Sequence, residues 1–270
     1  MEFSFQGKSI YYESHGRGEP LLILNGIFMT CGSWAAFVNA FSKSNRLLLL
    51  DFLDQGRSAK IDAEYTQELQ EELVIAFLDH AGLEKASLCG ISYGGEVAMR
   101  VAARHPGRVK KLVLANTTAY TSPWLKEIGH SWEYAFASGD GRQFFKTCIP
   151  TVYSPGFFER NYVWAREREA MFVKLFTQDV YDAFGRLTRS AESHDERENL
   201  KNIAAPTLVI SSEHDAITLP FLQRELAAAI PGAGHVVISG AGHASMYEKP
   251  SEFTALVLGF VNLDDEIQIL

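Results

Sequence analysis

The sequence predicts an α/β protein in which a mostly parallel, doubly wound sheet is covered by helices. Short continuous apolar runs recur along the chain, and such runs are typical of parallel strands that are buried on both faces. These runs alternate with segments of helical periodicity, which indicates repeated strand–helix–strand units. The length of 270 residues fits one large domain that carries an insertion.

The first elements predicted are an antiparallel hairpin, two buried strands and a helix between those strands. Apolar residues alternate on either side of Gln6-Gly7-Lys8, which predicts the hairpin. Continuous apolar runs predict strands over 20–24 and 46–51. Apolar residues at helical spacing predict a helix over 33–43, with Ser33 as its N-cap.

The same alternation continues toward the C-terminal end, apart from one long interruption. The predicted elements are a helix over 66–81, a strand over 86–91, a helix over 93–105, strands over 109–115 and 206–211, a helix over 219–230, a strand over 235–239 and a helix over 250–261.

Residues 120–202 interrupt this pattern, because they contain no convincing buried strand. They contain helix-like stretches rich in aromatic residues, separated by Pro150, Pro155 and Gly156. We therefore expect a core domain formed by 1–119 and 203–270, and a helical cap formed by 120–202. A few of the cap's aromatic side chains should face a cavity, because a layer inserted over a sheet edge usually closes a pocket.

Composition and charge argue against several classes of partner. The formal net charge is −8, whereas nucleic-acid backbones and anionic membranes attract clustered lysine and arginine. No apolar stretch reaches the roughly 18 residues that a membrane span needs. The N-terminus also lacks the basic and apolar regions of a secretory signal. We expect a cytoplasmic protein that binds neither nucleic acid nor membranes.

Neither a cofactor nor a metal is expected. The three cysteines, Cys31, Cys89 and Cys148, have no short pair spacing, so they predict small buried side chains. The sequence also contains no HExxH motif, no P-loop and no GxGxxG motif after the first strand.

The strongest chemical signal is Gly90-Ile91-Ser92-Tyr93-Gly94, followed by Gly95. The motif lies between a predicted strand and a predicted helix, where a sharp turn would hold the serine at its apex. Small neighbours are needed because a Cβ on the flanking glycines would collide with the adjacent strand or helix. The motif predicts Ser92 as a nucleophile, with the Tyr93 amide directed at the negative charge that develops beside it.

His243 is the predicted general base, because a serine hydroxyl is a weak nucleophile near neutral pH. It lies in a glycine-rich loop after the last strand, at the sheet edge where Ser92 is expected. We interpret His235 as structural and His80 as a packed core residue, and we expect His194 and His214 to be solvated.

Asp215, just after the strand over 206–211, is predicted to accept a hydrogen bond from the His243 imidazole and orient it. The chain order Ser92, Asp215, His243 is the one that accompanies a nucleophile elbow. Glu213 is the alternative acid, but it would lie closer to the strand end and could face the other way.

An oxyanion hole requires two donors. The Tyr93 amide is the first, and the loop Asn25-Gly26-Ile27-Phe28 is expected to supply the second. Gly26 allows the backbone to approach closely. The predicted donor is the Ile27 amide, with the Phe28 amide as the alternative.

These motifs resemble the α/β-hydrolase superfamily over nearly the whole chain outside 120–202. The resemblance is carried by Asn25-Gly26, Asp51 with Gly56-Arg57-Ser58, Gly90 to Gly95, Pro106-Gly107-Arg108-Val109, Asp215 and Gly242-His243. It implies an α/β-hydrolase fold with a mostly parallel eight-stranded sheet flanked by helices. It further implies a helical cap after the sixth strand, and acyl-enzyme chemistry without a cofactor.

Two features bear on where the chain lies within that superfamily. The oxyanion loop usually reads His-Gly, so Asn25-Gly26 removes a side chain that often braces the loop. A similar Asn-Gly opening occurs in an acyltransferase of the superfamily that joins hydroxyacyl chains from acyl carrier protein. The Ser92 nucleophile argues against the dehalogenase and epoxide hydrolase branches, which need a carboxylate at that position.

The sequence therefore predicts a serine-dependent hydrolase of carboxylic ester, thioester or lactone bonds (EC 3.1.1), acting on a hydrophobic small-molecule acyl substrate. Three alternatives stay open. They are an acyltransferase with an acyl or hydroxyacyl thioester donor, a lyase that retains the triad, and a triad-retaining receptor that signals by cap movement. The sequence also leaves a homodimer open.

Overall fold

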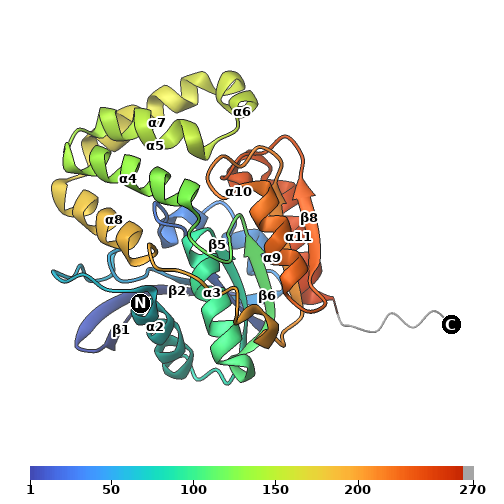
Figure 1. Ribbon diagram of the computed structural model, residues 1–270. Helices are drawn as coiled ribbons and strands as arrows, with labels where there is room; N and C mark the ends of the chain where they lie inside the picture. The colour runs from blue at the N-terminus through green and yellow to red at the C-terminus, as the bar shows by residue number, and fades with distance from the viewer. Residues whose placement is uncertain (264–270) are drawn as a thin grey trace.

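Eight strands form one sheet within residues 1–263, the part of the chain that the computed structural model describes (Figure 1). The strands are β1 (Glu2–Phe5), β2 (Lys8–His15), β3 (Glu19–Leu24), β4 (Asn45–Leu50), β5 (Ala86–Ile91), β6 (Val109–Ala115), β7 (Thr207–Ser212) and β8 (Gly234–Ile238). Their order in the sheet is β1-β2-β4-β3-β5-β6-β7-β8. The β1–β2 and β2–β4 pairs are antiparallel, and the other neighbouring pairs are parallel. The predicted mostly parallel eight-stranded sheet is confirmed.

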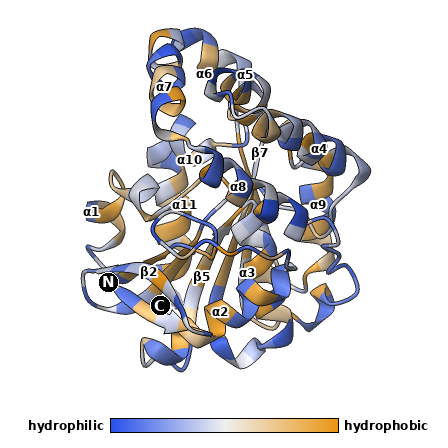
Figure 2. Cartoon of the chain, turned by 90° about the vertical axis from the view of Figure 1, so that its left-hand side faces the viewer, coloured by the Kyte–Doolittle hydropathy of each residue, from blue (hydrophilic) through white to orange (hydrophobic). Residues whose placement is uncertain are grey.

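Helices cover both faces of this sheet. They are α1 (Val38–Phe41), α2 (Gln67–His80), α3 (Tyr93–Arg104), α9 (Pro220–Ala229), α10 (Ser245–Glu248) and α11 (Pro250–Asn262), with short 3₁₀ turns η1 (Cys31–Trp34), η2 (Pro106–Arg108) and η3 (Leu200–Asn202). Successive strand residues face opposite sides, so Leu22 packs in the core under α2 and α3, and Ile23 packs in the core under α1 and α11. Figure 2 shows the central strands coloured as hydrophobic between these helices.

Between β6 and β7 the chain forms a separate layer of helices (Figure 1). These are α4 (Pro123–Ala137), α5 (Gly141–Val152), α6 (Pro155–Arg160), α7 (Tyr162–Leu175) and α8 (Gln178–Ser190). Their aromatic rings cluster, with Phe144 5.8 Å from Phe136 and 6.4 Å from Phe184 between centroids. Phe28 from the core joins this cluster at 5.2 Å from Phe144. The aromatic residues therefore hold the layer together and attach it to the sheet.

The predicted helix over 33–43 is wrong in extent. The segment forms η1 and the four-residue α1 instead, and Thr30 rather than Ser33 is the N-cap of η1. The segment is held by contacts to neighbouring loops: the Cys31 N–H donates to Asp51 Oδ1 at 2.6 Å, and Trp34 Nε1 donates to Asn25 at 2.8 Å. These tertiary hydrogen bonds override the helical periodicity of the segment.

All three cysteines are buried and unpaired, as the sequence predicted. Within residues 1–263, no helix has both the length and the apolar composition required to cross a lipid bilayer.

Candidate active site

Ser92 lies at the apex of the turn between β5 and α3. Its φ is +52° and its ψ is −119°, in a region that L side chains rarely adopt. The glycines that follow make this turn sterically feasible. A Cβ on Gly94 would collide with the carbonyl oxygen of Leu24, and a Cβ on Gly95 would lie 2.7 Å from Thr117 Cβ. The predicted steric reason for the motif therefore holds in the structure.

The structure brings Ser92, His243 and Asp215 into one continuous series of contacts. Ser92 Oγ lies 2.9 Å from His243 Nε2. On the other side of the ring, His243 Nδ1 lies 2.9 Å from Asp215 Oδ2 and 3.1 Å from Oδ1. The three residues follow the strands β5, β7 and β8. These strands run parallel to one another in the half of the sheet that ends at β8. Loops that follow parallel strands meet at one edge, so residues distant in sequence converge there.

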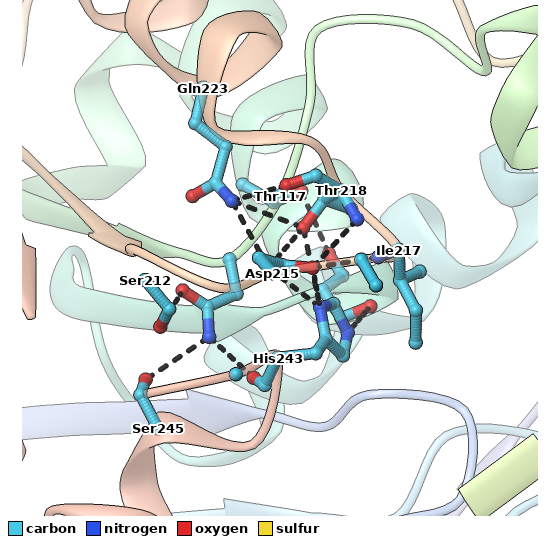
Figure 3. Close-up of polar contacts among 12 residues, drawn as sticks. Thr117, Ser212, Asp215, Ile217, Thr218, Gln223, His243 and Ser245 are labelled. Atoms are coloured by element: carbon cyan, nitrogen blue, oxygen red, sulfur yellow. Dashed lines mark hydrogen bonds and ion pairs between the residues drawn. The ribbon is translucent and has the colours of Figure 1, made fainter. Parts of the chain in front are cut away.

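The Asp215 carboxylate accepts hydrogen bonds from three neighbouring residues in addition to its contact with His243 (Figure 3). The backbone N–H groups of Ile217 and Thr218 each donate to Oδ1 at 2.9 Å. The Thr218 hydroxyl and the Gln223 side-chain amide donate to Oδ2 at 2.8 Å and 3.1 Å. A buried carboxylate requires such partners, and here they fix its orientation toward the imidazole.

Glu213, the alternative acid, faces a different loop. Its carboxylate accepts hydrogen bonds from the Ser239 hydroxyl at 2.6 Å and the Gly240 N–H at 2.8 Å. These hydrogen bonds lower the pKa of Glu213, the one from Ser239 having the larger effect. Of the two acidic residues, the structure therefore brings Asp215 to His243.

Two polar residues after β6, which the sequence analysis missed, brace the loops around Ser92 and His243. Asn116 has a φ of +48°, donates from Nδ2 to the carbonyl oxygen of His243, and accepts a hydrogen bond from Ser212 at 3.0 Å. The Thr117 hydroxyl donates to the carbonyl oxygen of Ser92 at 2.9 Å. Their only signal in the sequence is that polar residues follow a buried strand, and this pattern is too common to identify a brace.

The residues predicted to supply the oxyanion donors line the same pocket as Ser92. Tyr93 is the first residue of α3, where backbone N–H groups have no acceptor inside the helix. Ile27 and Tyr93 both line the pocket that contains Ser92. The Phe28 ring lies 4.7 Å from the ring of Trp132, within the aromatic cluster. The choice of the Ile27 amide over the Phe28 amide stays a prediction.

The loop predicted to supply the second oxyanion donor is braced even though the usual histidine is missing. The Asn25 side chain is buried, donates from Nδ2 to the Leu50 carbonyl at 2.9 Å, and accepts from Trp34 Nε1 at 2.8 Å. The Gly26 carbonyl also accepts a hydrogen bond from Gln55 at 2.8 Å. The expected loss of a bracing side chain was wrong, because Asn25 itself performs this role.

A pocket with about 640 Å³ of empty space, part of it open to solvent, lies over Ser92 between the sheet edge and the helical layer. Apolar side chains from both parts of the chain line it: Ile27, Leu125, Ile128, Trp132 and Ile217. Most of its lining surface is apolar, as is typical of small-molecule sites.

Glu96, one turn along α3 from Ser92, is a buried carboxyl group on the pocket wall. Burial raises the pKa of Glu96 to about 8, although hydrogen bonding from Gln67 and the charge of Arg100 act in the opposite direction. Burial therefore disfavours the charged form of Glu96 beside the pocket.

Two of the predictions about the other histidines were wrong. His235 is structural as predicted, with Nε2 2.8 Å from Ser211 Oγ. His80 is exposed at the end of α2 rather than packed in the core, while His194 is buried rather than solvated. His214 is exposed, as predicted. Within residues 1–263, no group of three or more His, Cys, Asp or Glu side chains is arranged to hold a metal ion.

Comparisons with known proteins agree with this architecture. The family model described as "alpha/beta hydrolase fold" matches residues 19–250. The crystal structure of MGS-M2, an alpha/beta hydrolase enzyme from a Medee basin deep-sea metagenome library, is 45% identical in sequence. The alignment of the two structures covers 100% of both chains and has a TM-score of 0.96.

Two further relatives carry the names of specific hydrolytic enzymes. The enol-lactonase from Burkholderia xenovorans LB400 is 27% identical, with a TM-score of 0.85, over 97% of this chain and 100% of that one. The 2-hydroxymuconate semialdehyde hydrolase from Pseudomonas sp. strain CF600 is 26% identical over 91% of this chain and 88% of its own length. These relatives support a hydrolytic activity. The family model, the sheet order and the 45% identity to MGS-M2 together show that this chain belongs to the α/β-hydrolase family.

Proposed function

We propose that this chain is a serine-dependent hydrolase of carboxylic ester, thioester or lactone bonds, and that it acts through an acyl-enzyme intermediate. The observation that carries the proposal is the series from Ser92 Oγ through the His243 imidazole to the Asp215 carboxylate, with 2.9 Å at each contact. An imidazole between a hydroxyl group and a buried carboxylate can remove the hydroxyl proton and is stabilised when it becomes charged.

In the acylation step, the Ser92 oxygen attacks the carbonyl carbon of the substrate while His243 Nε2 takes the hydroxyl proton. The electron pair of the carbonyl bond moves onto its oxygen, and the Tyr93 and Ile27 amides donate hydrogen bonds to that oxyanion. Each such donor usually lowers the barrier by about 3 kcal/mol. The tetrahedral species then expels the alcohol, thiol or enol, which receives the proton held by His243.

In the deacylation step, water replaces the leaving group. His243 takes a proton from the water as its oxygen attacks the acyl carbonyl, and the same two amides hold the new oxyanion. Collapse of this species breaks the bond to Ser92 Oγ, which receives the proton back from His243. Asp215 keeps its negative charge throughout and orients the imidazole in both steps.

We propose further that residues 120–202 act as a cap over a core domain formed by 1–119 and 203–270, of which 264–270 lie outside the described residues. Leu125, Ile128 and Trp132 from this cap line the pocket above Ser92, which supports a hydrophobic acyl substrate. The enol-lactonase among the relatives supports the inclusion of lactones in the substrate class.

The proposal is tested with a panel of p-nitrophenyl esters, acyl-CoA thioesters and lactones. We expect turnover of at least one substrate class by the wild type, and a loss of about 1,000-fold or more in Ser92→Ala. Ser239→Ala is the matched control, because this serine donates to Glu213 outside the triad and should keep wild-type turnover. Equal turnover by wild type and Ser92→Ala on every substrate would exclude the serine mechanism.

The same panel separates hydrolysis from the alternative reactions. Product analysis in the presence of competing alcohols or thiols distinguishes water from another acyl acceptor. A free carboxylic acid as the main product supports the hydrolase. An acceptor ester or thioester as the main product indicates an acyltransferase.

A further inference from the structure

Trp132 forms part of the wall of the pocket above Ser92, on the face of α4 that also carries Leu125 and Ile128. Its side chain is buried, with 6% of the residue exposed. The indole ring packs against Phe28 from the oxyanion loop, with 4.7 Å between the ring centroids. Trp132 is therefore held by contacts with both the helical layer and the loop beside the nucleophile.

The indole N–H of Trp132 is buried and has no hydrogen-bond acceptor among residues 1–263. Leaving a buried donor without a partner costs free energy, and each such group in a folded protein needs an explanation. Replacing the N–H by a carbon would remove this cost and keep the aromatic packing. An aromatic side chain without a polar atom would fill the same wall more favourably in the empty protein.

Two other tryptophans of this chain satisfy their indole N–H groups. Trp34 donates to Asn25 at 2.8 Å, and Trp124, on the same helix as Trp132, donates to the Ala216 carbonyl at 2.8 Å. Of these three tryptophans, the one that lines the pocket is the one whose indole N–H is unpaired. Nε1 has almost no accessible surface in the free protein, so a ligand bound in that pocket can supply the missing acceptor once the side chains that cover Nε1 move aside.

We propose that the indole N–H of Trp132 donates a hydrogen bond to the substrate, and that the pocket selects substrates with an acceptor oxygen outside the bond that is cleaved. This inference rests on the proposed function, because it assigns the specificity of that same site. The oxygen belongs to an ether, carbonyl or carboxylate group, each of which accepts one indole hydrogen bond. Trp132 contacts no reacting atom, so it determines specificity and takes no part in proton transfer.

The test uses two series of esters in which an ether oxygen replaces one methylene group. The first series consists of p-nitrophenyl heptanoate and its analogues, with the oxygen moved along the acyl chain from position 3 outward. The second consists of hexyl acetate and its analogues, with the oxygen moved along the alcohol chain. For each position, kcat/KM of the oxygen analogue is divided by that of the all-carbon ester, which cancels losses common to both substrates.

We expect one oxygen position at which this ratio falls about fivefold or more in Trp132→Phe relative to the wild type. Trp124→Phe removes an indole N–H from the same helix without touching the pocket wall, and it should keep the wild-type ratios. Unchanged ratios in Trp132→Phe at every position of both series would overturn the inference. A uniform loss on all substrates would also overturn it, since that result assigns Trp132 to packing alone.

A second measurement on the wild type keeps the inference testable if Trp132→Phe fails to fold. The indole ¹H–¹⁵N resonances of the four tryptophans are recorded with heptanoate and with its oxygen analogues, or with hexanol and its analogues. A downfield shift of the Trp132 indole proton that occurs only with an oxygen analogue supports the proposal. The absence of such a shift contradicts it. The proposed function is judged separately by Ser92→Ala, whose turnover does not depend on which oxygen position Trp132 recognises.

Discussion

At the scale of single residues, the two acidic side chains after β7 differ in the groups that donate hydrogen bonds to their carboxylate oxygens. Asp215 accepts hydrogen bonds from the backbone of Ile217 and Thr218 and contacts the imidazole of His243. Glu213 accepts hydrogen bonds from Ser239 and Gly240 in an exposed loop. The two carboxylates lie only two positions apart in the sequence, yet only one of them can orient the proposed general base.

Asp215→Asn should lower kcat by about 1,000- to 10,000-fold, because an amide fails to hold the His243 tautomer that accepts a proton from Ser92. Glu213→Gln is the matched control and should keep kcat near that of the wild type. The check is steady-state kinetics on the most active ester. The assignment fails if the two variants lose activity to the same extent.

The sequence was sufficient to predict Ser92, Asp215 and His243 as neighbours, because each follows a buried strand at the same edge of the sheet. It was insufficient for Asn116, whose side chain contacts the last residue of β7 and the loop after β8. The contribution of Asn116 depends on which strands are adjacent in space. Its local sequence carries no trace of that arrangement.

At the scale of elements, the turn from β5 to α3 depends on close approach between backbone segments. A Cβ on Gly94 would collide with the Leu24 carbonyl at the end of β3, whereas a Cβ on Gly107 would meet no atom within 4 Å. The spacing of glycines in the motif is therefore a property of how the helix packs on the sheet, and it was readable from the sequence. The segment 33–43 is the opposite case, because hydrogen bonds to other loops, rather than its local sequence pattern, determine its structure.

Gly94→Ala should destabilise the protein by about 3 kcal/mol, because either the helix or β3 must shift to relieve the collision. Gly107→Ala should change the free energy of unfolding by less than about 0.5 kcal/mol. Urea denaturation of both variants measures the difference. Equal stabilities would contradict the close packing between α3 and β3.

The connection from α8 back to the core contains the buried His194. Its Nε2 lies 3.1 Å from the Thr118 carbonyl, and its own carbonyl accepts a hydrogen bond from the Thr121 N–H at 2.9 Å. Burial lowers the pKa of His194 to about 4. The sequence predicted a solvated loop histidine, because the charged residues around it give no sign that the chain packs against residues 118–121.

His194 should make the folded state less stable as the pH falls from about 6.5 to about 4. In this window the unfolded chain binds a proton that the buried imidazole does not bind, so the unfolded state gains relative stability. The loss amounts to about 3 kcal/mol at most. Other groups titrate in the same range, so the measurement is the difference between wild type and His194→Asn. Parallel curves of unfolding free energy against pH would contradict the prediction.

At the scale of the whole molecule, the sheet and the helical layer contribute different parts of the site. The sheet edge supplies Ser92, His243 and Asp215 from three loops, and the helical layer supplies much of the pocket wall, including Trp132. Parallel strand packing explains why the first group was predictable. The sequence predicted the pocket wall only as an aromatic-rich insertion. It could not predict which side chains of α4 and α8 face the pocket, because this depends on how the helical layer packs against the core.

The central claim is that Ser92 becomes covalently acylated, and quench-flow mass spectrometry tests it most directly. The substrate is p-nitrophenyl pivalate, whose hindered acyl group slows deacylation. The account predicts a burst of p-nitrophenol accompanied by a pivaloyl adduct on the peptide that contains Ser92, with neither signal in Ser92→Ala. Turnover without any adduct on Ser92, or an equal burst from Ser92→Ala, would contradict it.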